Sequence, residues 1–147
     1  MATENQSAIL DTLTQLEDGA AAIVASGAGS AIIDVGLGMF VAGKVVIDIS
    51  AIAQTTDELY QISIQGSPDA AFGTAANIRD LAIYQLGAGE VLFNGTAASD
   101  VGAAGERHVI YFNNQLGDDR FRYLRLYVVT AGAAESITFK AWLTKMD

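Results

Sequence analysis

Residues 122–128 of the chain are RYLRLYV, and residues 137–144 are ITFKAWLT. In both stretches every second residue is apolar: Leu124, Leu126 and Val128 in the first, and Ile137, Phe139, Ala141 and Leu143 in the second. Successive side chains of a β-strand point to opposite faces of a sheet, so a period of two predicts strands with one buried face. These two stretches therefore predict strands of an all-β domain.

The same alternation occurs earlier in the chain, where Tyr60, Ile62 and Ile64 are separated by polar residues. Six further segments are strand-like: residues 20–24, 31–35, 44–49, 78–84, 90–93 and 107–112. The connecting segments, such as 27–29 and 36–38, contain the glycine, asparagine and aspartate typical of turns. Eight or nine short strands at this spacing predict an antiparallel β-sandwich or jelly roll. Repeated strand–helix alternation is absent from the pattern, which argues against an α/β fold.

The N-terminal segment has a different pattern. Apolar residues recur there at helical spacing behind Ser7, a suitable N-cap, and before Asp18 and Gly19, a suitable stop. These apolar residues are Ile9, Leu10, Leu13 and Leu16. A helix this short is marginal without packing. The pattern predicts either a short helix lying on the domain or an arm that becomes ordered against a neighbour, with residues 1–19 as the arm and 20–147 as the sandwich.

Composition excludes several classes of function. The 147-residue chain has a net charge of −9 and 51% hydrophobic residues, and it contains no cysteine and one histidine. Thiol catalysis, thiolate metal sites and multi-histidine metal sites are therefore excluded. The acidic balance disfavours direct binding to nucleic acid or to an anionic membrane. A basic N-terminal signal and an apolar run of about 20 residues are both missing, so we expect a protein made inside a cell that does not span a membrane.

The sequence offers little for catalysis. His108 lies in the alternating run RHVIYF and lacks a nucleophile motif such as G-x-S-x-G, so it is interpreted as a strand histidine. The acidic pairs Asp57–Glu58 and Asp118–Asp119 are sequence neighbours at turns, where solvated acids are common. We expect no enzyme activity and no cofactor. A weak calcium site at Asp69 or at Asp118–Asp119 stays open.

Basic and aromatic residues gather near the end of the chain. The residues singled out as a candidate interface are Arg122, Tyr123, Arg125, Tyr127 and Trp142. The alternation points Tyr123, Arg125, Tyr127 and Trp142 outward, and Arg122 belongs to the same cluster of arginine and aromatic residues. Arginine and the large aromatic residues are enriched in protein–protein interfaces. The alternative is an ordinary wet strand face on which arginine stems cover apolar surface.

Four segments together resemble the cement, or decoration, proteins of tailed-bacteriophage capsids. They are residues 30–36 (SAIIDVG), residues 60–72 (YQISIQGSPDAAF), residues 122–126 (RYLRL) and the closing strand at 137–145. Their order and spacing match that family over roughly residues 16–147. The resemblance implies a small jelly roll that forms a homotrimer. It also implies a place on the outer surface of a phage head, where trimers hold neighbouring major capsid proteins together against the pressure of the packaged DNA.

With this resemblance, the outward Arg–Tyr strand and Trp142 are expected to form the trimer contact, and the arm around Ile9, Leu10, Leu13 and Leu16 to reach a capsid subunit or a neighbouring trimer. The expected location is the virion exterior after synthesis in the host cytoplasm.

The loop at 67–72 and the RYLRL strand also resemble galactose-binding-like sandwiches, which bind carbohydrate through end loops. The flanking cysteines and aromatic-rich loops common in that family are missing here.

Overall fold

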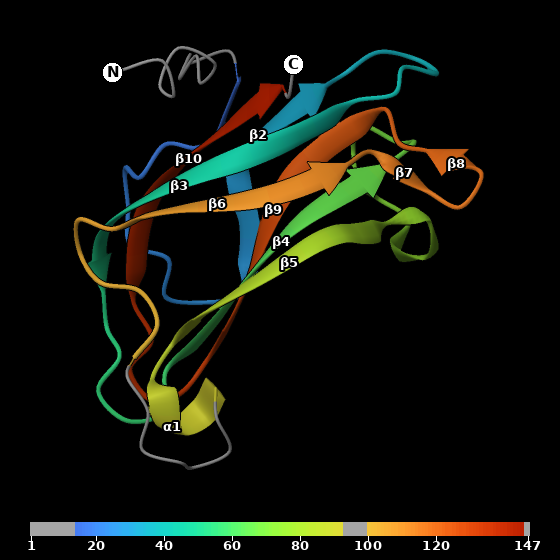
Figure 1. The fold of residues 1–147 in the computed structure, drawn as a ribbon. Coiled ribbons are helices and arrows are strands. Elements are labelled where there is room, and N and C mark those ends of the chain that lie inside the picture. The colour runs from blue at the N-terminus through green and yellow to red at the C-terminus, as the bar shows by residue number, and fades with distance from the viewer. Residues whose placement is uncertain (1–13, 93–99, 146–147) are drawn as a thin grey trace, which may run out of the picture.

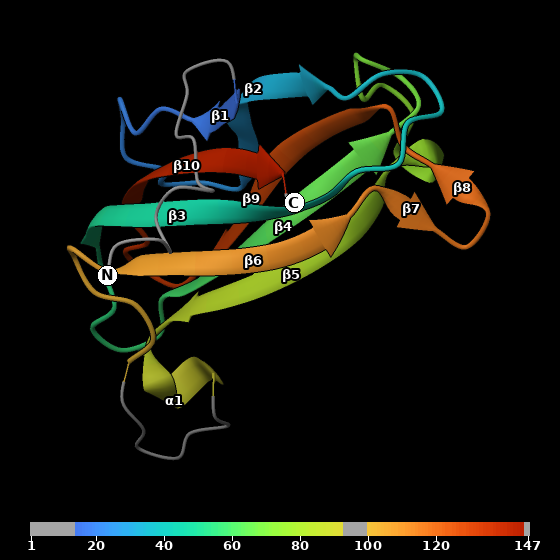
Figure 2. The ribbon, with the colours of Figure 1, turned by 45° about the horizontal axis from the view of Figure 1, so that its top comes forward.

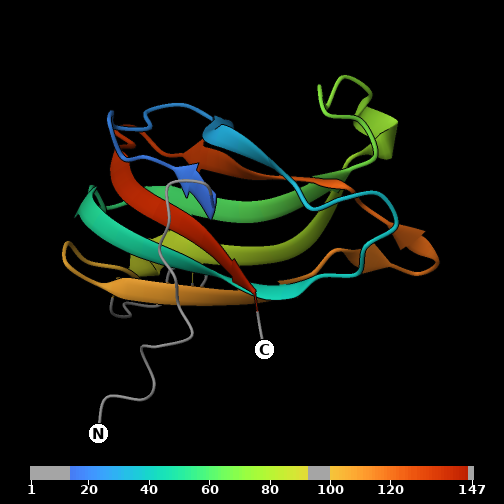
Figure 3. The same cartoon turned by 90° about the horizontal axis from the view of Figure 1, so that it is seen from above.

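A computed structural model of the chain describes residues 14–92 and 100–145. Eight strands form two four-stranded antiparallel sheets that pack face to face (Figures 1 and 3). Sheet A has the order β1 (Gln15–Glu17), β10 (Ile137–Lys145), β3 (Ala42–Ile52) and β6 (Arg107–Asn113). Sheet B has the order β2 (Gly27–Asp34), β9 (Tyr123–Ala131), β4 (Leu59–Ser67) and β5 (Arg79–Gly87).

The connectivity is that of a jelly roll. The chain crosses between the sheets at every connection among these eight strands except the β4–β5 hairpin. Three short elements complete the described structure: the hairpin of β7 (Gln115–Leu116) and β8 (Asp119–Arg120), a 3-10 turn at Ala75–Asn77, and the one-turn helix α1 (Gly89–Leu92). The predicted all-β antiparallel sandwich is thus confirmed.

The core lies between the sheets and includes the apolar residues of the predicted alternation at 60–64, 124–128 and 137–143. Its largest fully buried members are Tyr60, Phe139, Leu16, Ile47, Ile62, Ile64, Leu86, Leu124, Leu126, Ile137 and Val45. Tyr60 is buried with its hydroxyl satisfied, because Oη donates to the carbonyl of Ala53 (2.6 Å) and accepts from the N–H of Ser136 (2.8 Å). A satisfied hydroxyl removes the cost of burying a polar group, so this tyrosine fits the core.

The expected N-terminal arm ends earlier than residue 19, and the assignment of Leu16 to it is wrong. Residues 15–17 form strand β1, which pairs with β10 opposite Ala141 and Trp142. The Leu16 side chain is fully buried in the sandwich core, so it contacts no outside partner. Glu17 ties β1 to β2 across the connection between the two sheets, since its carboxylate accepts the N–H of Ser30 in β2. Ile9, Leu10 and Leu13 lie outside the described residues.

Three local expectations are also wrong. The strand expected at 20–24 is reduced to a single bridge between Ile23 and Ile137. The strand expected at 90–93 gives way to helix α1. The turn expected at 27–29 is the start of strand β2, where a Cβ on Gly29 would lie 2.7 Å from the carbonyl oxygen of Leu16. That glycine permits the close approach of β1 rather than a turn.

Candidate functional site

The outward side of β9 forms the centre of the outer face of sheet B. Residues opposite one another in an antiparallel pair share a face. Arg125 therefore lies in a row with Ile32 of β2 and Gln65 of β4, and Tyr127 lies in the next row with Ser63 of β4. We call this surface the Arg–Tyr face; it consists of Ile32, Ile83, Tyr123, Arg125, Tyr127 and Val129. The predicted outward orientation of Tyr123, Arg125 and Tyr127 is confirmed, and all three are half-buried.

Arg125 is held between two aromatic rings. Its guanidinium carbon lies 4.3 Å from the ring centre of Phe72 and 5.3 Å from that of Tyr127, distances suited to cation–π attraction. Its Nε donates to Oε1 of Gln65 (3.0 Å), and the Gln65 amide donates in turn to Asp80 (3.0 Å). Burial lowers the pKa of Arg125, but the guanidinium remains charged at neutral pH.

Phe72 is the last residue of the SPDAAF loop at residues 67–72, which is part of the resemblance to decoration proteins. Its φ is +50°, the only positive φ among the described residues other than glycine. Asp69 closes the loop, since its carboxylate accepts the N–H groups of Ala71 (3.0 Å) and Gly73 (3.3 Å). The Phe72 side chain is buried beneath Arg125. The loop is therefore built to deliver this ring to the Arg–Tyr face.

Arg122 is committed to an ion pair at the end of the same face. Its Nε and Nη2 donate to the two carboxylate oxygens of Asp34, at 2.8 and 2.7 Å. The Arg122 hydrogen bonds, helped by the N–H of Gly36, lower the pKa of Asp34 to about 2. The guanidinium also lies 5.0 Å from the ring centre of Tyr123. The two arginines singled out in the sequence thus hold β9 to its own neighbours, while the exposed apolar surface comes from Ile32, Ile83 and Val129.

Trp142 does not belong to the Arg–Tyr face. It lies on β10 in sheet A, where its register partners are Gln15 of β1 and Val46 of β3. The inward residues of β9 and β10 face each other across the core, so their outward residues lie on opposite sides of the molecule. Grouping Trp142 with the β9 residues is therefore wrong, since alternation separates inward from outward but does not say which sheet a strand joins.

A second apolar surface, which the alternation of the strands does not indicate, lies at one end of the sandwich. Four large side chains are exposed there: Leu37 (83%), Met39 (57%), Phe40 (50%) and Leu116 (51%). We call them the apolar tip. The first three come from the connection between β2 and β3, and the fourth from the β7–β8 hairpin, which lies beside that connection in Figures 1 to 3. The signal in the sequence was the run GLGMF, where apolar residues interrupt turn glycines.

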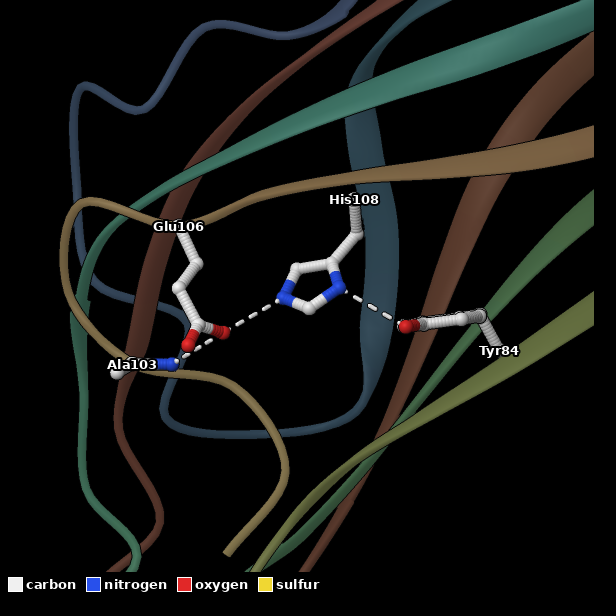
Figure 4. A network of polar contacts seen from close by, with 4 residues as sticks. All are labelled: Tyr84, Ala103, Glu106 and His108. Carbon is white, nitrogen blue, oxygen red and sulfur yellow. Dashed lines mark hydrogen bonds and ion pairs between the residues drawn. The ribbon is translucent and has the colours of Figure 1, made fainter.

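The single histidine bridges the two sheets on the side where β5 and β6 lie next to each other (Figures 2 and 4). His108 Nδ1 lies 2.9 Å from Oη of Tyr84, and Nε2 lies 3.0 Å from Oε2 of Glu106. The same Glu106 oxygen accepts the N–H of Ala103. Nε2–H donates to the Glu106 carboxylate, and Nδ1 shares a hydrogen bond with the Tyr84 hydroxyl, which can donate or accept. The arrangement ties β5, β6 and the preceding loop together, and every polar atom of the imidazole is used.

A shallow pocket of about 200 Å³ adjoins the apolar tip. It is lined by Pro68, Ala76, Asn77, Arg79, Asp119, Arg120 and Phe121. Arg79 is already engaged, because its Nη1 donates to the carbonyls of Ala76 (2.6 Å) and Ile78 (2.9 Å). Phe121 is buried and offers no aromatic platform to a ligand.

Within the part of the chain that the structure describes, no group of three or more acidic or histidine side chains is placed to hold a metal ion. No helix among those residues is long and apolar enough to cross a membrane. No protein family matches the chain, and no curated protein matches it either.

Proposed function

We propose that the protein is a structural virion component, a decoration protein that binds the outside of a phage head as a homotrimer and stabilises the lattice of major capsid proteins. The observation that carries the proposal is the Arg–Tyr face, where exposed Ile32, Ile83 and Val129 share one side of sheet B with an arginine fixed between two aromatic rings. The sequence resemblance to decoration proteins supports the same function.

The Arg–Tyr face has the composition of an interface. Aromatic and arginine side chains with few free charges are typical of the centre of protein–protein contacts. Arg125 and Arg122 are held by partners within the chain, so little side-chain entropy remains to be lost on association. A closed three-fold ring uses one heterologous contact three times, and each copy then adds a capsid contact at high effective concentration.

Light scattering tests the trimer directly. We expect a mass of three chains of 15.4 kDa each, stable over a range of concentrations. Val129→Lys places a charge on the Arg–Tyr face and should give single chains. Val109→Lys is the matched control, because Val109 lies outward on sheet A and is exposed to the same degree (37% against 40%). A single-chain wild type, or equal behaviour of the two variants, would contradict the proposed trimer contact.

Co-sedimentation tests the capsid partner. Empty heads assembled from the major capsid protein encoded in the same genome should bind the wild-type protein saturably and should resist heating better with it than without it. Heads that neither bind the protein nor gain heat resistance would contradict the proposal.

A carbohydrate-binding module is the second candidate, and the pocket beside Asn77 and Asp119 is the observation that favours it. Polar side chains at the end loops of a sandwich suit hydroxyl recognition. Titration calorimetry against a glycan panel decides between the candidates. Saturable binding that Asn77→Ala abolishes would favour the module over the decoration protein.

A further inference from the structure

The apolar tip is a rigid surface rather than a loose loop. Asn114, which is fully buried, makes five hydrogen bonds: three join the hairpin to the segment at Met39 and Val41, and two close the hairpin onto Phe121. The side-chain amide accepts the N–H of Val41 (2.7 Å) and donates to the carbonyls of Met39 (2.8 Å) and Phe121 (2.9 Å). The backbone N–H of Asn114 donates to the carbonyl of Val41, and its carbonyl accepts the N–H of Phe121. These bonds tie the backbone of the tip's two segments to each other.

Arg120 adds a second tie between the same segments. Its Nη1 donates to the carbonyl of Gly38 (3.1 Å), its Nε donates to Gln115 (3.1 Å), and its guanidinium carbon lies 5.9 Å from the Phe40 ring centre. Residues that are both exposed and pre-organised lose little conformational entropy on binding. Four large apolar side chains are exposed on this tied backbone, and exposed apolar patches on a folded protein often mark an interaction site.

The charges around the tip restrict what can bind there. Arg120 is the only basic residue in segments 35–41 and 113–121, and its Nε and Nη1 donate to groups within the chain. Asp118 and Asp119 are exposed beside it. An anionic lipid or a nucleic acid would be repelled by these acids and by the net charge of −9. A second copy docking tip to tip would bring the same acids together.

We propose that the apolar tip is the surface that docks on the phage head, inserting Leu37, Met39, Phe40 and Leu116 into an apolar depression of the major capsid protein that is bordered by basic side chains. This inference rests on the proposed function and names the part of the molecule that meets the shell. The tip is small, so one copy binds weakly. Three copies in a trimer bind together, and multivalency supplies the affinity.

The test measures binding of full-length protein to empty heads by co-sedimentation. The double variant Leu37→Asp with Leu116→Asp should lower the affinity for heads by at least about 100-fold, because charges would replace apolar side chains that become buried in the docked complex. Val24→Asp is the matched control. Val24 is similarly exposed (61%) but lies near the Ile23–Ile137 bridge at the opposite end of the sandwich, and its substitution should change affinity less than about 3-fold.

A second double variant tests whether basic side chains border the depression of the major capsid protein. Asp118→Asn with Asp119→Asn should weaken binding several-fold at low ionic strength and leave it unchanged at high salt, since exposed charges are screened. Equal binding of this pair and the wild type at every salt concentration would overturn the charge complementarity, and with it the proposed kind of partner.

The remaining outcomes separate this inference from the proposed function. A wild type that binds no heads would overturn both. Heads that bind the Leu37→Asp, Leu116→Asp variant as well as the wild type would overturn the docking surface and leave the decoration function standing. A double variant that light scattering finds as single chains would make the tip a contact between copies. Tip-dependent binding to vesicles of phosphatidylcholine would make it a lipid-binding surface. Either result would overturn the inference.

Discussion

The guanidinium carbon of Arg125 lies 4.3 Å from the ring centre of Phe72, and this contact joins strand β9 to the loop that follows β4. It brings together the two sequence motifs, RYLRL and SPDAAF, that are far apart along the chain. The arginine covers a buried ring whose backbone has a positive φ. Because L-residues with large side chains rarely adopt such a φ, tertiary contacts must hold Phe72 in place.

Replacing Arg125 by alanine should therefore destabilise the protein. Loss of the cation–π contacts and of the cover over Phe72 is expected to lower the free energy of unfolding by about 1–2 kcal/mol. Arg125→Lys should restore only part of this, because lysine cannot keep both the stacking and the bond to Gln65. Urea unfolding measures the effect, with exposed Lys140→Ala as a control expected within about 0.5 kcal/mol. Equal stability of Arg125→Ala and the wild type would contradict the role of this contact.

Asn114→Ala should be one of the most damaging single substitutions. It removes three side-chain hydrogen bonds and leaves the buried carbonyl of Phe121 and the part-buried Met39 carbonyl and Val41 N–H without this partner, at a cost of about 3 kcal/mol or more. The adjacent Asn113→Ala is the matched control. Asn113 is exposed and its side chain accepts the N–H of Gln115, so its loss should cost less than about 1 kcal/mol. Thermal unfolding that ranks the two variants equally would rule out the clamp.

Gly66→Ala should be strongly destabilising although alanine is a small residue. A Cβ at Gly66 would lie 2.7 Å from Cβ and Cγ of buried Phe121 and 3.0 Å from Leu81. Relief of that overlap requires movement of packed groups, at a cost of about 1–3 kcal/mol. Gly27→Ala serves as the control, since a Cβ there meets nothing within 4 Å. Chemical denaturation that finds both variants as stable as the wild type would show that the backbone yields freely at Gly66.

Glu58 should make stability depend on acid pH. The N–H of Thr56, followed by contacts with Thr55, holds the pKa of Glu58 at about 2, below its ordinary value of 4.5. The unfolded chain then binds more protons than the folded one in this interval, so stability falls as pH falls from about 5 towards 2. Glu58→Gln should flatten that part of the profile. Denaturant unfolding at a series of pH values measures it, and an unchanged slope in the variant would count against Glu58.

Tyr84→Phe tests whether the contact with His108 stabilises the pairing of the two sheets. Removing Oη leaves Nδ1 of His108 without its partner and should cost about 1 kcal/mol. Tyr111→Phe on the exposed outer side of β6 is the control and should stay within about 0.5 kcal/mol. If calorimetric melting curves of the two variants coincide, the histidine contributes nothing to this edge of the sandwich.

Much of the fold could be predicted because alternation reports directly on burial. The inward residues Leu124, Leu126 and Val128 of β9 are all fully buried, as their spacing predicts. The failures occur where a tertiary contact outweighs the local pattern. Leu16 has helical spacing from Leu13, yet it is drawn into a strand because β10 offers a sheet edge with which to pair.

The candidate site was predictable only in part, because its contacts too are made between residues that are distant in sequence. Outward orientation of Arg125 and Tyr127 follows from the period of two, but their ring and amide partners come from other strands and loops. Trp142 was misplaced because no local signal assigns a strand to one sheet or the other. The apolar tip depends on Asn114, whose partners Met39 and Val41 are remote in sequence.

The position of β10 between β1 and β3 has a consequence for synthesis. Sheet A lacks a central strand until residues 137–145 are available, because β3 and β1 have no other contact with each other in the sheet. A nascent chain still held on the ribosome at that point can form the β4–β5 hairpin but cannot close the sandwich. Completion then depends on pairing strands that are distant in sequence, which places folding in the range of about milliseconds to seconds. Until the sandwich closes, the incomplete chain exposes unpaired strand edges. This is the stage at which it is most prone to aggregate.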